Sequence, residues 1–487
     1  MRGRFAPFLV GAALIALALV MLLFCGYALL VGDPVLGFAI TMVCAGLLGF
    51  LLTRFGLRRA EPKRREALLA VLLLWLSVPL IGAIPYAISG GFSFLNAVFE
   101  SMSGFTATGA TVLQDFEALP ETLFMYRALS QWFGGIGILV IFIAVFPQLA
   151  IAGRQIFFAE APGPTEERMT PRLRSTASAI LIVYVGLTTL CALAYRLGGM
   201  DSFDAVAHSF TTLAAGGFSP RSHSFESFAN PTLEWIAIVF MIFAGANFAL
   251  QYRAISGRPR ELFKDAEFRA YLLIIAVAGA LLSLSLLARF PAWDAFRHGF
   301  FQVLSILTTT GYASTDFAQW SERAQMVLLV LMFIGGSAGS AGGGVKVVRW
   351  LIIGKNTARE VRRALYPRAV VPVRVGNRVV PEEVLRSVAA FITLYVGLFA
   401  ITTALLAMLG ADFVTAFTAA IGSIGNIGPG LSSVGPMLNY AELHPVSRGI
   451  LIFGMYAGRL EMVTVFVIFT ARWWQLPRQS PLNVGRR

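Results

Sequence analysis

The sequence predicts an all-α integral membrane protein in which four pseudo-repeats surround one central pore. Each repeat would consist of a helix, a pore half-helix, a filter loop and a second helix, and two extra N-terminal transmembrane helices would precede the first repeat. Three observations predict this fold class: the composition, the recurrence of long apolar segments, and four glycine turns at one common spacing.

The composition is that of a membrane protein. The 487 residues are 57% hydrophobic and only 13% charged, whereas soluble domains carry about 25% charged residues. Apolar runs of about 20 residues, the length that a bilayer core requires, recur along the chain. We expect ten crossings, at roughly residues 5–31, 35–56, 67–89, 121–149, 176–198, 232–255, 270–290, 324–353, 383–409 and 445–471.

The net charge of +13 follows the predicted topology. Arginine and lysine gather in alternate connections between the spans, and the opposite connections are sparsely charged. The positive-inside rule therefore places both termini in the cytoplasm. We expect no nucleic-acid partner, although anionic membrane lipid or an acidic protein could bind the basic inner loops. The basic connections are residues 58–65, 154–174, 253–269, 355–378 and 472–487.

Four short segments each end in a glycine that lies between two apolar spans. The glycines are Gly109, Gly217, Gly311 and Gly428, and the residues thirteen positions earlier are Asn96, Asp204, His298 and Thr415. A helix of about thirteen residues is only ~20 Å long, too short to cross the bilayer, so it must enter and turn back. Irregular backbone at membrane depth is tolerated only where protein buries it or water reaches it. A single glycine of this kind is more typical of helix packing, but four at one offset favour turns that share an axis.

The chemistry of such turns suits a cation. Rings of backbone carbonyls can replace the hydration shell of an ion, and glycine lets successive carbonyls point the same way without a side chain on the axis. The C-terminal ends of the half-helices add partial negative charge. None of the four turns contains a charged side chain, so ion selection would depend on carbonyl geometry.

Five short motifs resemble the Trk/Ktr/HKT superfamily of potassium transport proteins. The motifs are SGFTATGAT at 103–111, QWFGGIG at 131–137, GGGVK at 342–346, NIGPG at 426–430 and GRLE at 458–461. The similarity extends from about residue 65 to 472, and the two additional N-terminal spans favour the bacterial TrkH/TrkG branch. The resemblance implies transport of K⁺, with Rb⁺ also accepted, no covalent cofactor, and a homodimer.

The resemblance also implies which backbone groups coordinate K⁺. The carbonyls would belong to the two residues before each filter glycine, and glycine at all four filter positions favours K⁺ over Na⁺. The sequence departs from the common pattern at Ala107 and Ala215, where threonine is frequent. The predicted filter comprises Ala107, Thr108, Gly109, Ala215, Gly216, Gly217, Thr309, Thr310, Gly311, Asn426, Ile427 and Gly428.

A glycine-rich run interrupts the eighth predicted span. Each glycine costs a helix about 1 kcal/mol relative to alanine, so the run cannot hold a rigid helix. The resemblance implies an intramembrane loop that closes the pore beneath the filter, helped by the positive charge of Arg459. The alternatives are a passive kink, a phosphate-binding loop, which would need a Gly-Lys-Ser/Thr sequence, and for Arg459 an internal ion pair with Glu461. The predicted gate comprises Gly335, Gly336, Gly339, Gly342, Gly343, Gly344 and Arg459.

Three other polar features are expected to be structural. Glu100 and Arg127 would form an ion pair near the outer mouth, and His208 and His298 would make polar contacts on or near half-helices. Lys346 is expected to extend toward the inner surface, because a lysine near the end of a span commonly does so.

The function predicted from these residues is potassium uptake across a bacterial inner membrane through a K⁺-selective, gated, channel-like pore. No dinucleotide-binding fingerprint is present, so nucleotide control would require a separate cytosolic subunit similar to TrkA. A proton- or sodium-coupled symporter on the same scaffold is the alternative, and an enzyme is not expected because no catalytic cluster is evident. The predicted divisions are 1–60 (two N-terminal helices), 61–155 (repeat 1), 156–260 (repeat 2), 261–380 (repeat 3 with the glycine-rich loop) and 381–487 (repeat 4).

Overall fold

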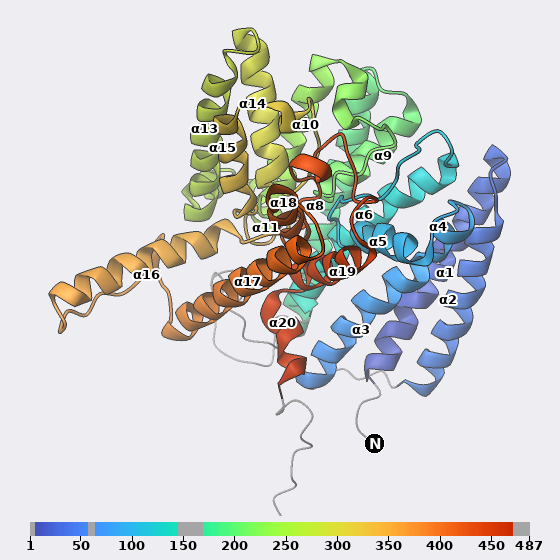
Figure 1. Cartoon of the computed structure of the whole chain (residues 1–487). Coiled ribbons are helices and arrows are strands. Elements are labelled where there is room, and N and C mark those ends of the chain that lie inside the picture. Colours follow the sequence, from blue (N-terminus) through green and yellow to red (C-terminus); the bar gives the residue numbers. More distant parts are fainter. Residues whose placement is uncertain (1–4, 57–63, 145–168, 471–487) are drawn as a thin grey trace, which may run out of the picture.

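The computed structural model describes residues 5–56, 64–144 and 169–470, and helices dominate it (Figure 1). The strands are the short antiparallel pair β1 (Arg374–Val375) and β2 (Arg378–Val379). The divisions predicted near residues 60 and 155 and much of the basic sequence used for topology, including 58–63, 154–168 and 472–487, lie outside the described residues.

The first two helices form a hairpin at one edge of the molecule (Figure 1). α1 (Phe5–Val31) and α2 (Leu36–Phe55) approach closely, because a methyl group on Gly11 would lie only 2.7 Å from the carbonyl oxygen of Gly49. Small residues permit such close helix contact inside a membrane. The hairpin is also tied to the rest of the chain, since Asp33 Oδ2 accepts a hydrogen bond of 2.9 Å from the Thr122 amide at the start of α6.

The remaining helices follow one order four times: a long helix, a short helix, a turn, and a second helix. The short connecting helices are α4 (Ile84–Ile88) and α12 (Arg260–Lys264), with 3₁₀ turns at Ser224–Phe228, Phe317–Gln319, Ser432–Val434 and Val467–Phe469. The first group contains α3 (Arg64–Gly82), α5 (Phe94–Phe105) and α6 (Glu121–Ala144), and the second α8 (Met169–Leu197), α9 (Ser202–Leu213), α10 (Pro231–Gly245) and α11 (Phe248–Ile255). The third contains α13 (Ala266–Leu286), α14 (Ala292–Leu307), α15 (Glu322–Met332) and α16 (Val347–Leu365), and the fourth α17 (Glu382–Met408), α18 (Phe413–Ile424), α19 (Pro445–Arg459) and α20 (Met462–Phe466).

Six helices of the described residues are long and apolar enough to cross a membrane, and two bent helix pairs would raise that number to eight. The predicted spans at 232–255 and 445–471 are not continuous helices, although each bent pair could still form one span. The first bends by 104° between α10 and α11, and the second by 113° before Met462. The predicted span at 324–353 is likewise divided into α15, a loop at residues 333–346, and α16.

Local polar groups explain the bend between α10 and α11. Asn247 Oδ1 accepts hydrogen bonds from the amides of Ala249 and Leu250, so it caps the new helix. Gln251 Nε2 donates to the carbonyls of Phe243 (2.8 Å) and Ala246 (3.1 Å) at the break, and the Phe243 carbonyl also accepts the Ala246 amide. Both helix ends are thereby satisfied at a depth where water is scarce.

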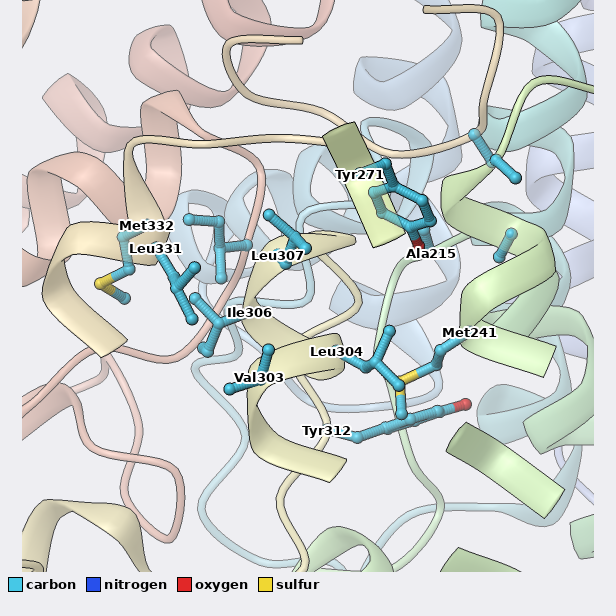
Figure 2. Close-up of a cluster of buried hydrophobic side chains, with 14 of the residues drawn as sticks. Ala215, Met241, Tyr271, Val303, Leu304, Ile306, Leu307, Tyr312, Leu331 and Met332 are labelled. Carbon is cyan, nitrogen blue, oxygen red and sulfur yellow. The ribbon is translucent and has the colours of Figure 1, made fainter. Parts of the chain in front are cut away.

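A buried apolar cluster surrounds the short helix α14. Figure 2 shows Leu304 of α14 beside Met241 of α10 and Tyr312, and Ile306 near Leu331 and Met332 of α15. All of these side chains are almost fully buried. The cluster fixes the height and rotation of α14, and therefore the position of the turn that follows it.

Replacing Asn247 with alanine should lower the free energy of unfolding by about 1 kcal/mol, because helix α11 loses its N-terminal cap. The thermal unfolding midpoint of the purified protein in detergent measures this change. Thr189→Ala, on an exposed face of α8, serves as the control. Equal midpoints for the two variants would show that the Asn247 cap contributes nothing.

Candidate selectivity filter and gate

The four short helices begin close to the positions that the glycine spacing predicts. α5, α9 and α18 begin two residues before Asn96, Asp204 and Thr415, respectively. A side chain caps each of these three helices: the residue three positions before the predicted start accepts a hydrogen bond from the amide of the residue at the predicted start. α14 begins earlier, six residues before His298, and follows Pro291, which has no side-chain acceptor. The capping residues are Ser93, Asp201 and Asp412, with acceptor distances of 3.4, 2.7 and 3.0 Å.

All four short helices end in the same backbone motif. The residue two positions before each filter glycine is left-handed, and the next amide bonds to the carbonyl five residues back. This is a Schellman motif, in which glycine is usual at the left-handed position. Here the position holds other residues, each at a cost of about 1–2 kcal/mol. The left-handed residues are Ala107, Ala215, Thr309 and Asn426, with φ of 49°, 53°, 61° and 53°.

The four filter glycines then bring the turns into a closed ring. Each is itself left-handed, and each lies against the carbonyl oxygen that precedes the filter glycine of the next turn. Turn 1 thus contacts turn 2, turn 2 contacts turn 3, turn 3 contacts turn 4, and turn 4 contacts turn 1. A methyl group on Gly109 would lie 2.2 Å from Gly216 O, on Gly217 1.9 Å from Thr310 O, on Gly311 2.2 Å from Ile427 O, and on Gly428 2.7 Å from Thr108 O.

The structure therefore brings all twelve residues of the predicted filter together, although they come from segments more than 300 positions apart in the sequence. Asn426 Nδ2 donates to Thr108 Oγ1 at 2.9 Å and joins the fourth turn to the first. Tyr440 OH donates to Gly428 O at 2.6 Å. Such side-chain bonds hold backbone that has no helical or strand partners.

A buried ion pair supports the first and second turns. Arg127 Nη2 lies 2.6 Å from Glu100 Oε1, and both side chains are almost fully buried, which confirms the predicted pair. Glu100 also accepts the Val112 amide at 3.0 Å, and the Arg127 guanidinium lies 4.1 Å from the centre of the Phe218 ring. Separating the two partners would leave a buried charge unpaired. The pair therefore constrains the chain segments that follow the first and second filter turns.

The two histidines on the half-helices make the structural contacts that we expected. His208 bonds through Nδ1 to the Asp204 carbonyl (2.8 Å) and through Nε2 to Ser219 Oγ (3.1 Å). His298 Nδ1 lies 2.9 Å from Ser314 Oγ. Each histidine joins a half-helix to the chain that leaves a filter turn.

The glycine-rich loop lies directly against the third and fourth turns. A methyl group on Gly342 would lie 2.5 Å from Thr308 O, and one on Gly343 would lie 2.5 Å from Gly425 O. The Gly343 amide donates to Thr309 Oγ1 at 2.6 Å. Small residues are required at this place because the loop and the ends of α14 and α18 are in contact.

The bend of α10 supplies the partners that this loop needs. The amides of Ser337 and Ala341 donate to the carbonyls of Gly245 (2.8 Å) and Ala244 (3.2 Å) at the end of α10. The Gly335 amide donates to Val345 O at 2.8 Å and closes the base of the loop. The backbone amides of the loop are thus hydrogen-bonded to carbonyls at the broken end of α10 and within the loop itself. Backbone groups buried in a membrane need such partners.

Arg459 reaches the loop from α19. Its Nη1 donates to Ala341 O at 2.9 Å and its Nη2 to Gly134 O of α6 at 3.1 Å. The alternative of an ion pair with Glu461 is wrong, because Glu461 pairs with Arg349 instead. The guanidinium therefore joins the loop to the first repeat.

Two further polar residues contact the loop in ways that the sequence does not reveal. Lys346 Nζ donates to the Gly342 carbonyl, so the expectation that it extends toward the inner surface is wrong. Glu267, in the first turn of α13, accepts the amides of Ala338 (2.7 Å) and Val348 (3.0 Å) through Oε1. Its one sequence signal is a carboxylate at the edge of an apolar span, where an ionisable group needs partners.

Comparison with known proteins identifies the family. The model of the TrkH family, described as a cation transport protein, matches residues 35–476. The chain belongs to the TrkH family of cation transport proteins. This finding confirms the predicted family, whose members are transport proteins and not enzymes.

Relatives and a solved structure agree with this assignment. The Trk system potassium uptake protein TrkH of Salmonella typhimurium is 38% identical over 430 residues, which cover 86% of this chain and 87% of that protein. The TrkH protein of Vibrio parahaemolyticus is 37% identical over 477 residues, covering 96% and 97%. The crystal structure of the potassium transporter TrkH from Vibrio parahaemolyticus matches with a TM-score of 0.89 at 35% identity, covering 98% of this chain and 100% of that chain. The predicted helical membrane fold is therefore confirmed.

Alanine at Gly217 should reduce selectivity more than alanine at Gly428. Both positions are left-handed, but the added methyl group meets the neighbouring carbonyl at 1.9 Å in the first case and 2.7 Å in the second. We expect Gly217→Ala to lower the K⁺/Na⁺ permeability ratio by roughly tenfold, equivalent to ~1.4 kcal/mol. Comparison of K⁺ and Na⁺ flux into liposomes measures the ratio for each variant. A larger loss of K⁺/Na⁺ selectivity for Gly428→Ala than for Gly217→Ala would contradict the ring geometry.

Replacing Glu267 should loosen the glycine-rich loop. Glu267→Ala leaves the buried Val348 amide and the partly buried Ala338 amide without an acceptor, at a cost of about 1–3 kcal/mol. Glu267→Gln keeps an oxygen for them and is the matched control. Resting Rb⁺ efflux from liposomes should increase in the order wild type, Gln variant, Ala variant, and equal efflux from all three would exclude this role.

Proposed function

We propose that the chain takes up potassium across the bacterial inner membrane through a K⁺-selective, gated, channel-like pore. One observation carries the proposal: the four glycine turns contact one another in cyclic order, each through a carbonyl oxygen of the residue that precedes a filter glycine. The names of the relatives, which are potassium uptake proteins, support potassium as the ion.

The ring would select K⁺ through its backbone. Carbonyls of the twelve residues predicted as the filter would replace the water around the ion. The half-helices α5, α9, α14 and α18 each end at the ring, so their C-terminal ends would add partial negative charge. The left-handed residues before the filter glycines favour this interpretation, since backbone strain of this kind gathers at functional sites.

The glycine-rich loop and Arg459 would form the gate. The loop packs against Thr309 and Gly425, next to the ring, and Arg459 bonds to Ala341 within the loop. A positive charge held there would oppose a cation. Opening would require the loop to release its contacts with α10 and α14. The gate residues are those predicted: Gly335, Gly336, Gly339, Gly342, Gly343, Gly344 and Arg459.

The partners would lie on the cytoplasmic side. We propose a homodimer with cytoplasmic termini, regulated by a TrkA-like nucleotide-binding subunit and surrounded by anionic lipid. Helix α16, which extends away from the rest of the bundle, carries Lys355, Arg362 and Arg363 and would offer basic side chains to such partners (Figure 1). The five sequence divisions would correspond to the N-terminal hairpin and four pore repeats.

Cation flux into liposomes that contain the purified protein tests the function. K⁺, Rb⁺, Na⁺ and Li⁺ are compared with and without an imposed proton gradient. We expect K⁺ and Rb⁺ to move down their own gradients and Na⁺ and Li⁺ to move far more slowly. Flux that requires a proton or sodium gradient would instead favour a coupled symporter on the same scaffold, and equal flux of all four ions would contradict the proposed filter.

A further inference from the structure

One glutamine side chain is bonded to both sides of the second filter turn. Gln131 lies on α6, is fully buried, and points its amide at this turn. Its Nε2 donates to the carbonyl oxygen of Gly216 at 2.7 Å, and its Oε1 accepts the amide of Phe218 at 3.1 Å. A carbonyl can only accept and a backbone amide can only donate, so the two partners fix the orientation of the glutamine amide.

This contact distinguishes the second turn from the other three. The carbonyl oxygens of Thr108, Thr310 and Ile427 occupy the equivalent places in the ring. Within the described parts of the chain, no side chain donates a hydrogen bond to any of these three oxygens. Among the residues that the structure describes, the Gly216 carbonyl is therefore the one of these four oxygens to which a side-chain amide donates.

The composition of the second turn agrees with this arrangement. The residue before the filter glycine is threonine, threonine and isoleucine in the first, third and fourth turns, but glycine in the second. A methyl group on Gly216 would lie 2.5 Å from both Cδ and Oε1 of Gln131. The absence of a side chain at residue 216 and the presence of Gln131 are thus complementary: the glutamine occupies the space that a larger residue would need.

Residues one turn to either side of Gln131 make close contacts. Gly134, one turn farther along α6, lies so close to the first turn that a methyl group on it would be 2.2 Å from Phe105 O. Arg127, one turn earlier, is held by Glu100. Helix α6 is therefore packed closely against the filter on both sides of Gln131, which limits how far the Gln131 amide can shift.

We propose that Gln131 determines ion specificity by restraining the Gly216 carbonyl, an inference that rests on the proposed filter. A carbonyl oxygen has two lone pairs, so one can accept the Gln131 amide while the other faces an ion. The bound N–H places partial positive charge beside the oxygen and keeps it from turning toward a smaller ion. Na⁺ needs closer and stronger oxygen ligands than K⁺, so both effects disfavour Na⁺, whether fit or field strength dominates selectivity.

Two variants and one control test this role in liposomes. Gln131→Met keeps the length of the side chain and removes both hydrogen bonds. Gln131→Glu keeps the shape and an acceptor for the Phe218 amide but removes the N–H donor, and the fluxes are measured at alkaline pH so that the carboxyl is ionised. Gln302→Met is the matched control. Gln302 is equally buried and donates to the carbonyl of Tyr312, the residue that follows filter glycine Gly311. The Tyr312 carbonyl also accepts a hydrogen bond from Ser305 Oγ, so it keeps one partner in the variant.

We expect both Gln131 variants to conduct Rb⁺ while their Na⁺/Rb⁺ flux ratio rises roughly three- to tenfold, the range that the loss of one hydrogen bond would produce. The Gln302 variant should keep the wild-type ratio. A wild-type ratio in either conducting Gln131 variant would overturn the inference, and so would an equal rise in the Gln302 variant. If the wild-type protein conducts neither K⁺ nor Rb⁺, the proposed function itself fails, and that result is distinct from a failure of the role of Gln131.

Discussion

The structure depends on the need to satisfy backbone polar groups where water is scarce. Four turns, one glycine-rich loop and two bent helices place irregular backbone between apolar spans. Each would be costly alone, because an unpaired amide or carbonyl in hydrocarbon costs several kcal/mol. Together they supply one another with partners, and the contacts between the loop and the end of α10 are the clearest example.

The ring of turns adds a steric constraint to the need for backbone hydrogen bonds. Each filter glycine touches a carbonyl of the next turn. A side chain at any filter glycine, or a shift of any turn along the axis, would therefore displace the neighbouring turn. The left-handed residues before the glycines are strained, and the Schellman hydrogen bonds hold them in place. The same closeness that makes the ring rigid keeps the carbonyls at the spacing on which ion selection would depend.

Charged side chains near the ring act mainly as ties between segments. Glu100 and Arg127 join the first and second turns, Arg459 joins the loop to α6, and Glu267 joins the loop to the start of α16. A buried ion pair does not necessarily stabilise a fold, but it does penalise arrangements that separate the partners. These ties therefore define one arrangement of a region that contains many glycines.

Much of this architecture could be predicted from the sequence because its signals are local. The apolar length of each span and the common spacing of the filter glycines can be recognised within single segments of the sequence. The bends at Asn247 and before Met462 were not predicted, because no proline marks either break and hydropathy does not report hydrogen-bond partners.

The sequence by itself determined the class of protein, most of the long apolar helices, the four turns and the residues that compose them, since composition and spacing carry that information. Only the tertiary structure decided which groups meet. Gln131 bonds to Gly216, Glu461 pairs with Arg349 and not with Arg459, and Glu267 contacts the glycine-rich loop across long stretches of chain. The physical reason is that a side-chain hydrogen bond depends on the packing of whole helices, which no local pattern of residues specifies.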